Sequence, residues 1–199
     1  MCLVAKRKSD NKSQPGRLRI VAGNWRSRLL EIADVPGLRP TSARIRETVF
    51  NWLAPRIDGA RCLDLFAGTG ALGLEALSRG ATACDFVEKS SKAAKTLRRN
   101  IASLEAKSAT VFEGSAEKFL EQPGATKYEI VFLDPPFAAA MLADLCRLLE
   151  ASEVLAGGAR IYVEEDRNQP MFDMPDGWQV LKSKESGNVR YSLLEANNN

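Results

Sequence analysis

The sequence has no histidine among its 199 residues, so it lacks the side chain most often used for general acid–base catalysis. Ser-His-Asp and Cys-His arrangements are excluded, and any proton must pass to carboxylates, hydroxyls, lysines, backbone carbonyls or water. The usual nitrogen ligand of zinc is absent, and the four cysteines form no CxxC pair; they are Cys2, Cys62, Cys84 and Cys146. We therefore expect reduced, mostly buried thiols and no bound metal.

Long apolar runs and a secretory signal are lacking as well. The first residues show no charged segment followed by an apolar run and a small-residue cleavage site, and charges interrupt the later leucines every few positions. A chain of 199 residues with 45% hydrophobic content can bury one substantial core. We expect a monomeric cytoplasmic protein, without a membrane partner, made of one catalytic domain and a small appendage.

Charge is spread unevenly along the chain, although the net charge is only +3. Residues 1–56 hold 12 Lys and Arg against 4 Asp and Glu, whereas the remainder holds 16 against 21. Residues 1–16 are polar and basic, a composition that cannot bury enough apolar surface to order itself. They are expected to form a flexible arm, whose charges either are simply solvated or bind phosphate.

Residues 17–56 are expected to form a small N-terminal extension. Two short apolar runs, 18–22 and 25–30, flank Gly23-Asn24, a pair that tolerates positive φ, and predict a β-hairpin. Apolar residues at helical spacing then predict a helix that ends near Ala54, with Thr41 as its cap.

Basic residues of this extension are candidates for phosphate contact. On the helix, Arg44 and Arg46 either contact phosphate or form ion pairs at the surface, for instance with Glu47. Trp25, flanked by arginines, either stacks on a base or anchors the hairpin to the domain. The candidate nucleic-acid-binding residues are Arg17, Arg19, Trp25, Arg26, Arg28, Arg44 and Arg46.

From residue 57 onward, strand-like and helical runs alternate. The expected strands are 61–65, 83–88, 109–113, 129–133 and 160–164, and the helices between them are 71–78, 91–103, 117–121 and 139–150. This alternation is typical of a parallel, doubly wound α/β sheet with helices on both faces. Two further strand-like runs, 178–184 and 189–195, have no helix between them and predict an antiparallel hairpin at one side of the sheet.

A glycine-rich segment links the first strand of this domain to its first helix. It runs from Asp64 to Gly73, contains Gly68 and Gly70, and is followed by Glu88 twenty residues beyond Gly68. The glycines allow the backbone to approach a ligand, and an acid at the end of the second strand accepts hydrogen bonds from ribose hydroxyls. The pattern indicates a nucleoside-bearing cofactor, with close packing of the glycines as the alternative.

The acid at the strand tip bears on which cofactor this is. Asp64 beside a pyrophosphate would add like-charge repulsion of about 4 kcal/mol at the effective dielectric of a protein surface. NAD is therefore disfavoured, and S-adenosylmethionine, with its ammonium and sulfonium, is a more favourable neighbour. The alternative is that Asp64 caps the helix or the turn.

A second motif follows the apolar strand 129–133, which runs directly into Asp134-Pro135-Pro136-Phe137. Two prolines cannot continue a central strand, so they hold its tip at the carboxyl edge of the sheet, where ligands bind. The Asp134 carboxylate and the Pro135 carbonyl are then fixed acceptors for an exocyclic amine, and Phe137 can stack on the base. The alternative is that these residues only terminate the strand.

These motifs together resemble the RsmD family of 16S ribosomal RNA guanine-N2 methyltransferases. The resemblance rests on DLFAGTGALGLEALSRGA, FVEK, DPPF and RPTSARIRETVFNWL, and extends from about Leu18 to Leu194. It implies a Rossmann-like methyltransferase with a seven-stranded sheet, S-adenosylmethionine as donor, and a guanine of the small ribosomal subunit, or of its assembly intermediate, as acceptor.

The resemblance also assigns roles to residues. It implies that Asp134, Pro135, Pro136 and Phe137 hold the target base and that Arg44 and Arg46 face RNA. Ser115 departs from the pattern, because such enzymes often have Asp there, so its contact with adenine is in doubt. The implied cofactor-binding residues are Asp64, Phe66, Gly68, Gly70, Glu88, Ser115, Ala116, Arg39, Pro40 and Thr41.

Two competing interpretations remain open. Asp-Pro-Pro-aromatic motifs also serve adenine, cytosine and glutamine amide nitrogens, so a DNA or a protein-glutamine methyltransferase is compatible with the motif, although the basic N-terminus argues against a protein substrate. An NAD-dependent oxidoreductase or a non-catalytic nucleotide-binding module is the alternative of a different class.

Overall fold

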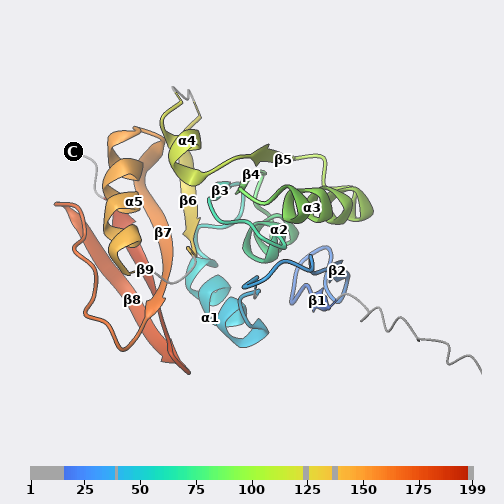
Figure 1. Cartoon of the computed structure of the whole chain (residues 1–199), viewed down its shortest axis with the longest axis horizontal. Helices are drawn as coiled ribbons and strands as arrows, with labels where there is room; N and C mark the ends of the chain where they lie inside the picture. Colours follow the sequence, from blue (N-terminus) through green and yellow to red (C-terminus); the bar gives the residue numbers. More distant parts are fainter. Residues whose placement is uncertain (1–15, 39, 123–125, 136–138, 197–199) are drawn as a thin grey trace, which may run out of the picture.

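The computed structural model describes residues 16–38, 40–122, 126–135 and 139–196, and the architecture is given for these ranges. A seven-stranded sheet with strand order β5-β4-β3-β6-β7-β9-β8 forms its centre (Figure 1). The strands are β3 (Arg61–Asp64), β4 (Ala83–Glu88), β5 (Ala109–Glu113), β6 (Tyr128–Leu133), β7 (Leu155–Asp166), β8 (Trp178–Ser186) and β9 (Val189–Ala196). The helices are α1 (Ala43–Leu53), α2 (Ala71–Ser78), α3 (Ser91–Leu104), α4 (Ala116–Leu120) and α5 (Ala139–Ala151).

The sheet confirms the predicted α/β architecture. Strands β5, β4, β3, β6 and β7 pair in parallel, and β9 is antiparallel to both β7 and β8. The parallel part alternates with helices along the chain, whereas the β8–β9 hairpin has no helix between its strands.

Both faces of the central strands β3 and β6 are buried, which is why these strands are mostly apolar, whereas the edge strand β8 is largely exposed. Along β6, Ile130 and Phe132 pack with residues of α1, α2 and α3, whereas Val131 and Leu133 pack with residues of α4 and α5. Each fully buried side chain of this size contributes about 1.5–3 kcal/mol. The two apolar clusters therefore fix the strand register, and with it the residues that stand at the carboxyl ends of the strands.

The N-terminal extension differs from the predicted tight hairpin. Strands β1 (Arg17–Arg19) and β2 (Leu29–Glu31) pair antiparallel, so residues 20–28 form a long loop instead of two longer strands around Gly23-Asn24. The physical reason is that the loop binds α2. Asn24 N donates to the Ser78 carbonyl at 2.7 Å, and a Cβ placed on Gly23 would lie 1.8 Å from that oxygen.

Helix α1 begins as expected but has a different cap. The Ser42 hydroxyl, and not that of Thr41, accepts the Ile45 amide at 3.3 Å. The Thr41 side chain therefore does not cap the helix and is buried in the interior of the molecule. None of the helices in the described ranges is both long and apolar enough to cross a membrane.

Candidate functional site

Acidic side chains stand at the carboxyl ends of four neighbouring strands. Asp64 and Glu88 end β3 and β4, Asp134 directly follows β6, and Glu164 lies in β7 opposite the end of β6. Parallel strands bring these ends to one edge of the sheet, which is where ligands bind in this architecture. The carboxyl edge of the sheet is therefore strongly acidic, and both the glycine-rich segment and the Asp134-Pro135 motif lie at it.

The glycine-rich loop leads from β3 into α2. Gly68 and Gly70 have positive φ of 52° and 83°, and Gly70 is the N-cap of α2. A Cβ on Gly70 would meet Leu97 at 2.5 Å, so this glycine is also required by the packing of α2 against α3. A Cβ on Gly68 would meet Leu38 at 2.8 Å, which places Leu38 directly over the loop.

Asp64 has the helix-capping role that was one of its two interpretations. Its carboxylate accepts the Gly73 amide at 3.0 Å near the N-terminus of α2 and is only 3% exposed. Burial, with a smaller contribution from Glu88, raises the pKa of Asp64 to about 7 despite this hydrogen bond. An ionised Asp64 is thus costly in the free protein and would be stabilised by a neighbouring cation.

Glu88 lies directly beside the glycine loop. Its two carboxylate oxygens accept the Gly68 amide at 2.8 Å and the Ser90 amide at 2.7 Å, which fixes its orientation between the loop and the start of α3. Farther along the edge, the Ser115 hydroxyl accepts the Lys118 amide as the N-cap of α4. Contact between Ser115 and an adenine stays a prediction.

These residues fit S-adenosylmethionine, the cofactor that the resemblance of the motifs implies. Its ammonium and sulfonium match the charge of an acidic edge, and a fixed carboxylate at the end of β4 suits a ribose diol. The Thr69 hydroxyl, in the glycine loop itself, is buried without a hydrogen-bond partner among the described residues. A buried polar atom of this kind is ordinarily satisfied, so it marks the loop as a place where a ligand can supply a partner.

Asp134 accepts a hydrogen bond from a residue of the N-terminal extension, Thr41. The Thr41 hydroxyl donates to Asp134 Oδ2 at 3.3 Å, and Pro135 behind it is buried. Burial, followed by the charges of Glu164 and Asp64, raises the pKa of the Asp134 carboxyl well above its ordinary value. The structure therefore brings together Asp64, Thr41 and Asp134, three residues predicted from separate motifs.

Glu164 and Tyr162 belong to this group but were not predicted. Glu164 is 7% exposed and accepts the Tyr162 hydroxyl at 2.6 Å, and burial raises the pKa of its carboxyl. A signal was present in the sequence, because the expected strand 160–164 ends in an acid, as the expected strand 83–88 does at Glu88. Arg39, Pro136 and Phe137 lie outside the described residues.

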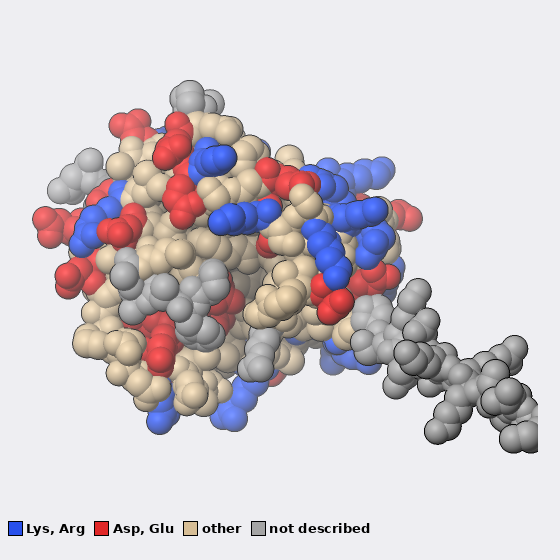
Figure 2. Space-filling model, viewed as in Figure 1, with Lys and Arg blue, Asp and Glu red and all other residues tan. Residues whose placement is uncertain are grey.

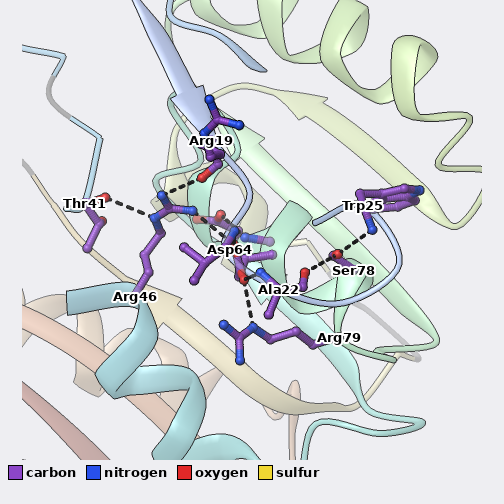
Figure 3. Close-up of polar contacts among 11 residues, drawn as sticks. Arg19, Ala22, Trp25, Thr41, Arg46, Asp64, Ser78 and Arg79 are labelled. Carbon is purple, nitrogen blue, oxygen red and sulfur yellow. Dashed lines mark hydrogen bonds and ion pairs between the residues drawn. The ribbon is translucent and has the colours of Figure 1, made fainter. Parts of the chain in front are cut away.

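The structure corrects the prediction that Arg46 contacts RNA. Arg46 is 1% exposed and forms an ion pair with Glu75 at 3.0 Å. It also donates to the carbonyls of Thr41 at 3.2 Å and Arg19 at 2.8 Å (Figure 3). Arg46 lies on the buried side of α1, next to Ile45, and there it faces Glu75 of α2. The buried carboxylate of Glu75 requires a cation, and Arg46 supplies it. Its role is to fasten the extension to the domain.

Glu75 is the other half of this junction. Its carboxylate accepts the amides of Val21 and Ala22 at 2.8 and 3.0 Å and also pairs with Arg79. Nearby, the Trp25 amide donates to the Ser78 hydroxyl, and the indole packs partly buried against the core (Figure 3). The structure therefore supports the anchoring interpretation of Trp25, and stacking on a base stays a prediction.

The other predicted RNA-binding arginines are exposed. They are Arg17, Arg19, Arg26, Arg28 and Arg44. Further basic side chains, which no motif marks, gather over α3 beside the extension (Figure 2): they are Lys92, Lys95, Arg98 and Arg99. The Arg28 guanidinium donates to the Ser103 carbonyl at 2.6 Å and so joins the two groups.

Comparisons with known proteins agree with this arrangement. The model of the family described as conserved hypothetical protein 95 matches residues 18–195. Ribosomal RNA small subunit methyltransferase D of Escherichia coli is 46% identical over 94% of each chain. The solved structure of yhhF from Escherichia coli, at 42% identity, covers 92% of this chain and 100% of that chain with a TM-score of 0.86.

A more distant structure contains a bound cofactor product. SMU.776, solved with SAH, is 13% identical, covers 97% of this chain and 58% of that chain, and has a TM-score of 0.72, which shows a shared fold. The match over residues 18–195 and the 46% identity to a named relative, in contrast, reach well beyond fold. The chain therefore belongs to the family described as conserved hypothetical protein 95, the RsmD family that its motifs resemble.

Proposed function

We propose that this protein transfers a methyl group from S-adenosylmethionine to the exocyclic N2 amine of a specific guanine in 16S ribosomal RNA. The observation that carries the proposal is Asp134, a half-buried carboxyl directly after β6, which accepts the Thr41 hydroxyl and is followed by the buried Pro135. Relatives named ribosomal RNA small subunit methyltransferase D support the substrate class.

Several residues of the edge would hold S-adenosylmethionine. Glu88 would accept hydrogen bonds from the ribose hydroxyls, and the backbone of Gly68 and Gly70 would border the methionine part. Asp64 would lie near the positive end of the cofactor, where a cation lowers its pKa and favours its ionised form. The bound cofactor supplies an electrophilic methyl group on a sulfonium, so the reaction requires no metal.

The protein's own contribution is to orient the acceptor amine. The lone pair of an exocyclic amine is delocalised into the base, so the nitrogen is a poor nucleophile in its planar form. Asp134 and the Pro135 carbonyl would accept its two hydrogens and turn the nitrogen toward the methyl group. As the nitrogen becomes positive, the carboxylate stabilises it more than in the ground state, which lowers the barrier. Stacking of Phe137 on the base stays a prediction.

The basic surface suits a polyanion. The exposed arginines of the extension adjoin the basic residues of α3, three of which pair only with exposed acids. Surface ion pairs of this kind are worth about 0–1 kcal/mol, so phosphates can displace them at little cost. We expect the protein to act as a monomer in the cytoplasm, on 16S rRNA within a small subunit or its assembly intermediate.

Mass spectrometry of nucleosides tests this proposal. Small-subunit RNA from cells with and without the protein should differ in N2-methylguanosine at one position, and the purified protein should restore it with labelled S-adenosylmethionine. A different methylated base, or label in DNA or in a glutamine side chain instead of RNA, would replace the proposed acceptor. Oxidation of NADH without methyl transfer would overturn the reaction class.

Within this assay, Asp134→Ala should lower the single-turnover rate by about a hundredfold, or roughly 3 kcal/mol, while cofactor affinity changes little. A near wild-type rate for a folded Asp134→Ala protein would leave the motif as a structural stop.

A further inference from the structure

Glu164 occupies a position equivalent to that of Asp134 on the neighbouring strand. Strands β6 and β7 pair in parallel with Leu133 opposite Val163, so the residues that follow, Asp134 and Glu164, stand side by side at the carboxyl edge. Thr41 approaches this pair from the segment before α1, and its hydroxyl donates to Asp134 Oδ2 at 3.3 Å.

The surroundings of Glu164 do not explain it as a structural residue. It is 7% exposed, and no Lys or Arg forms an ion pair with it within the described ranges; it accepts a hydrogen bond from the Tyr162 hydroxyl at 2.6 Å. A buried carboxylate without a cation is costly for folding. Glu165, the next residue, shows the ordinary solution, since it is equally buried but pairs with Arg190 at 3.3 Å.

We propose that Glu164 is a positioning residue for methyl transfer, which acts through Asp134: together with Thr41 it fixes the carboxylate that holds the target amine. This inference rests on the proposed function, since it needs an amine at Asp134. It adds a role for β7 that no motif of the sequence assigns. The pair of carboxyls also provides the negative charge that the amine requires as it becomes cationic.

The balance of the reaction shows why two carboxyls help. As the N–C bond forms, the S–C bond breaks and its electron pair stays on sulfur, so the positive charge moves from sulfur to the amine nitrogen. The methylated amine then gives one N–H proton to a carboxylate oxygen of Asp134. Glu164, whose carboxyl is close to that of Asp134, favours this transfer because it makes Asp134 a better proton acceptor. The proton passes to water after the product leaves.

The sign of the pH effect follows from the groups that face Asp134. These are Asp64 from β3 and Glu164 from β7, with Tyr162 and Tyr191 behind Glu164, while Arg46 reaches only the Thr41 carbonyl. The charge of Glu164 raises the pKa of Asp134, and the Thr41 hydroxyl lowers it. Activity requires ionised Asp134, so the rate should decline on the acid side as this group is protonated.

The test is a single-turnover rate profile against pH, with saturating RNA and S-adenosylmethionine, for the full chain and two variants. Glu164→Gln should lower the plateau rate by about tenfold, less than the loss of a directly contacting group. It should also shift the acid limb about one pH unit lower, because a like charge has been removed. The Michaelis constant for RNA should change less than the turnover number.

Thr41→Val gives the opposite shift and serves if Glu164→Gln folds poorly. It keeps the volume but removes the hydroxyl, so the acid limb should move to higher pH while the plateau also falls. Glu165→Gln is the matched control: it removes a buried carboxylate from the adjacent position of the same strand and should leave the acid limb unchanged.

Folded Glu164→Gln protein with a wild-type plateau and an unmoved acid limb would overturn the inference. A shift of the limb with Glu165→Gln, or none with Thr41→Val, would do the same. Failure of the proposed function is distinct, because then the wild-type protein itself would not methylate guanine N2.

Discussion

Replacement of Arg46 by Ala separates a structural role from an RNA-binding role. The variant loses an ion pair with Glu75 and the hydrogen bonds to the carbonyls of Thr41 and Arg19, all in a region where Arg46 is 1% exposed. Removal of one partner from a buried pair costs about 3–5 kcal/mol, because the remaining charge is left uncompensated. Arg79 still pairs with Glu75 at 2.8 Å, so we expect a loss near the lower limit of that range.

The magnitude is large enough to measure by unfolding. For a chain of this length, 3 kcal/mol corresponds to a decrease in melting temperature of about 6–12 °C. Urea unfolding followed by circular dichroism, together with calorimetry, should be carried out on wild-type protein, Arg46→Ala and Arg44→Ala. Arg44 lies in the same helix but is exposed, so its replacement should change stability by no more than about 0.5 kcal/mol.

RNA binding supplies the reciprocal measurement. Arg44→Ala should weaken RNA binding and reduce its salt dependence if that side chain contacts a phosphate, whereas Arg46→Ala should leave the salt slope unchanged at a temperature where it is folded. An Arg46→Ala protein of wild-type stability with a reduced salt slope would refute the reasoning, since it would show the guanidinium to be free for RNA.

Three further outcomes follow from the site and the basic surface. Glu88→Ala should weaken S-adenosylmethionine binding by at least about tenfold, or 1.4 kcal/mol, and abolish most of the thermal stabilisation that the cofactor gives; calorimetry that finds NADH binding instead would contradict this. Because burial raises the pKa of Asp64 to about 7, binding of the cationic cofactor should release a proton from Asp64 near neutral pH, and the affinity should increase as the pH rises through 7. The released proton is taken up by the buffer, so calorimetric binding heats that do not depend on the buffer would contradict this prediction. Replacement of four arginines by Ala should reduce the slope of log RNA affinity against log salt and leave cofactor affinity unchanged; the four are Arg17, Arg19, Arg26 and Arg28. An unchanged slope would mean that these side chains are only solvated at the surface.

Periodicity was sufficient to predict the sheet but not the docking of the extension. Short apolar runs between helical segments predicted the parallel strands, because both faces of the central strands are buried, and the absence of a helix between the last two runs predicted the β8–β9 hairpin. Gly23-Asn24 has the chemistry of a tight turn, yet the Asn24 amide donates to the Ser78 carbonyl at the end of α2. The sequence contains no sign of this competition, because Ser78 lies more than fifty residues away.

Arg46 shows a similar limit within the site. An arginine in a basic, helical segment is more often exposed than buried, and only the position of Glu75 on α2 reverses that expectation. Glu75 itself was unremarkable in the sequence, as a single acid within an apolar helix. Glu164 differs, because a strand that ends in an acid could have been recognised from the pattern of Asp64 and Glu88.

The contacts of Thr41 connect the N-terminal extension to Asp134. Its carbonyl accepts Arg46 Nε, and its hydroxyl donates to Asp134. The same guanidinium binds the Arg19 carbonyl, in the strand that exposes arginines to solvent. A displacement of β1 relative to α2 would therefore disturb a hydrogen bond to Asp134 through only two side chains. Since Arg46 is buried and Glu75 holds it from α2, we expect the extension and Asp134 to keep a fixed relative position, which the proposed RNA substrate requires if it contacts both.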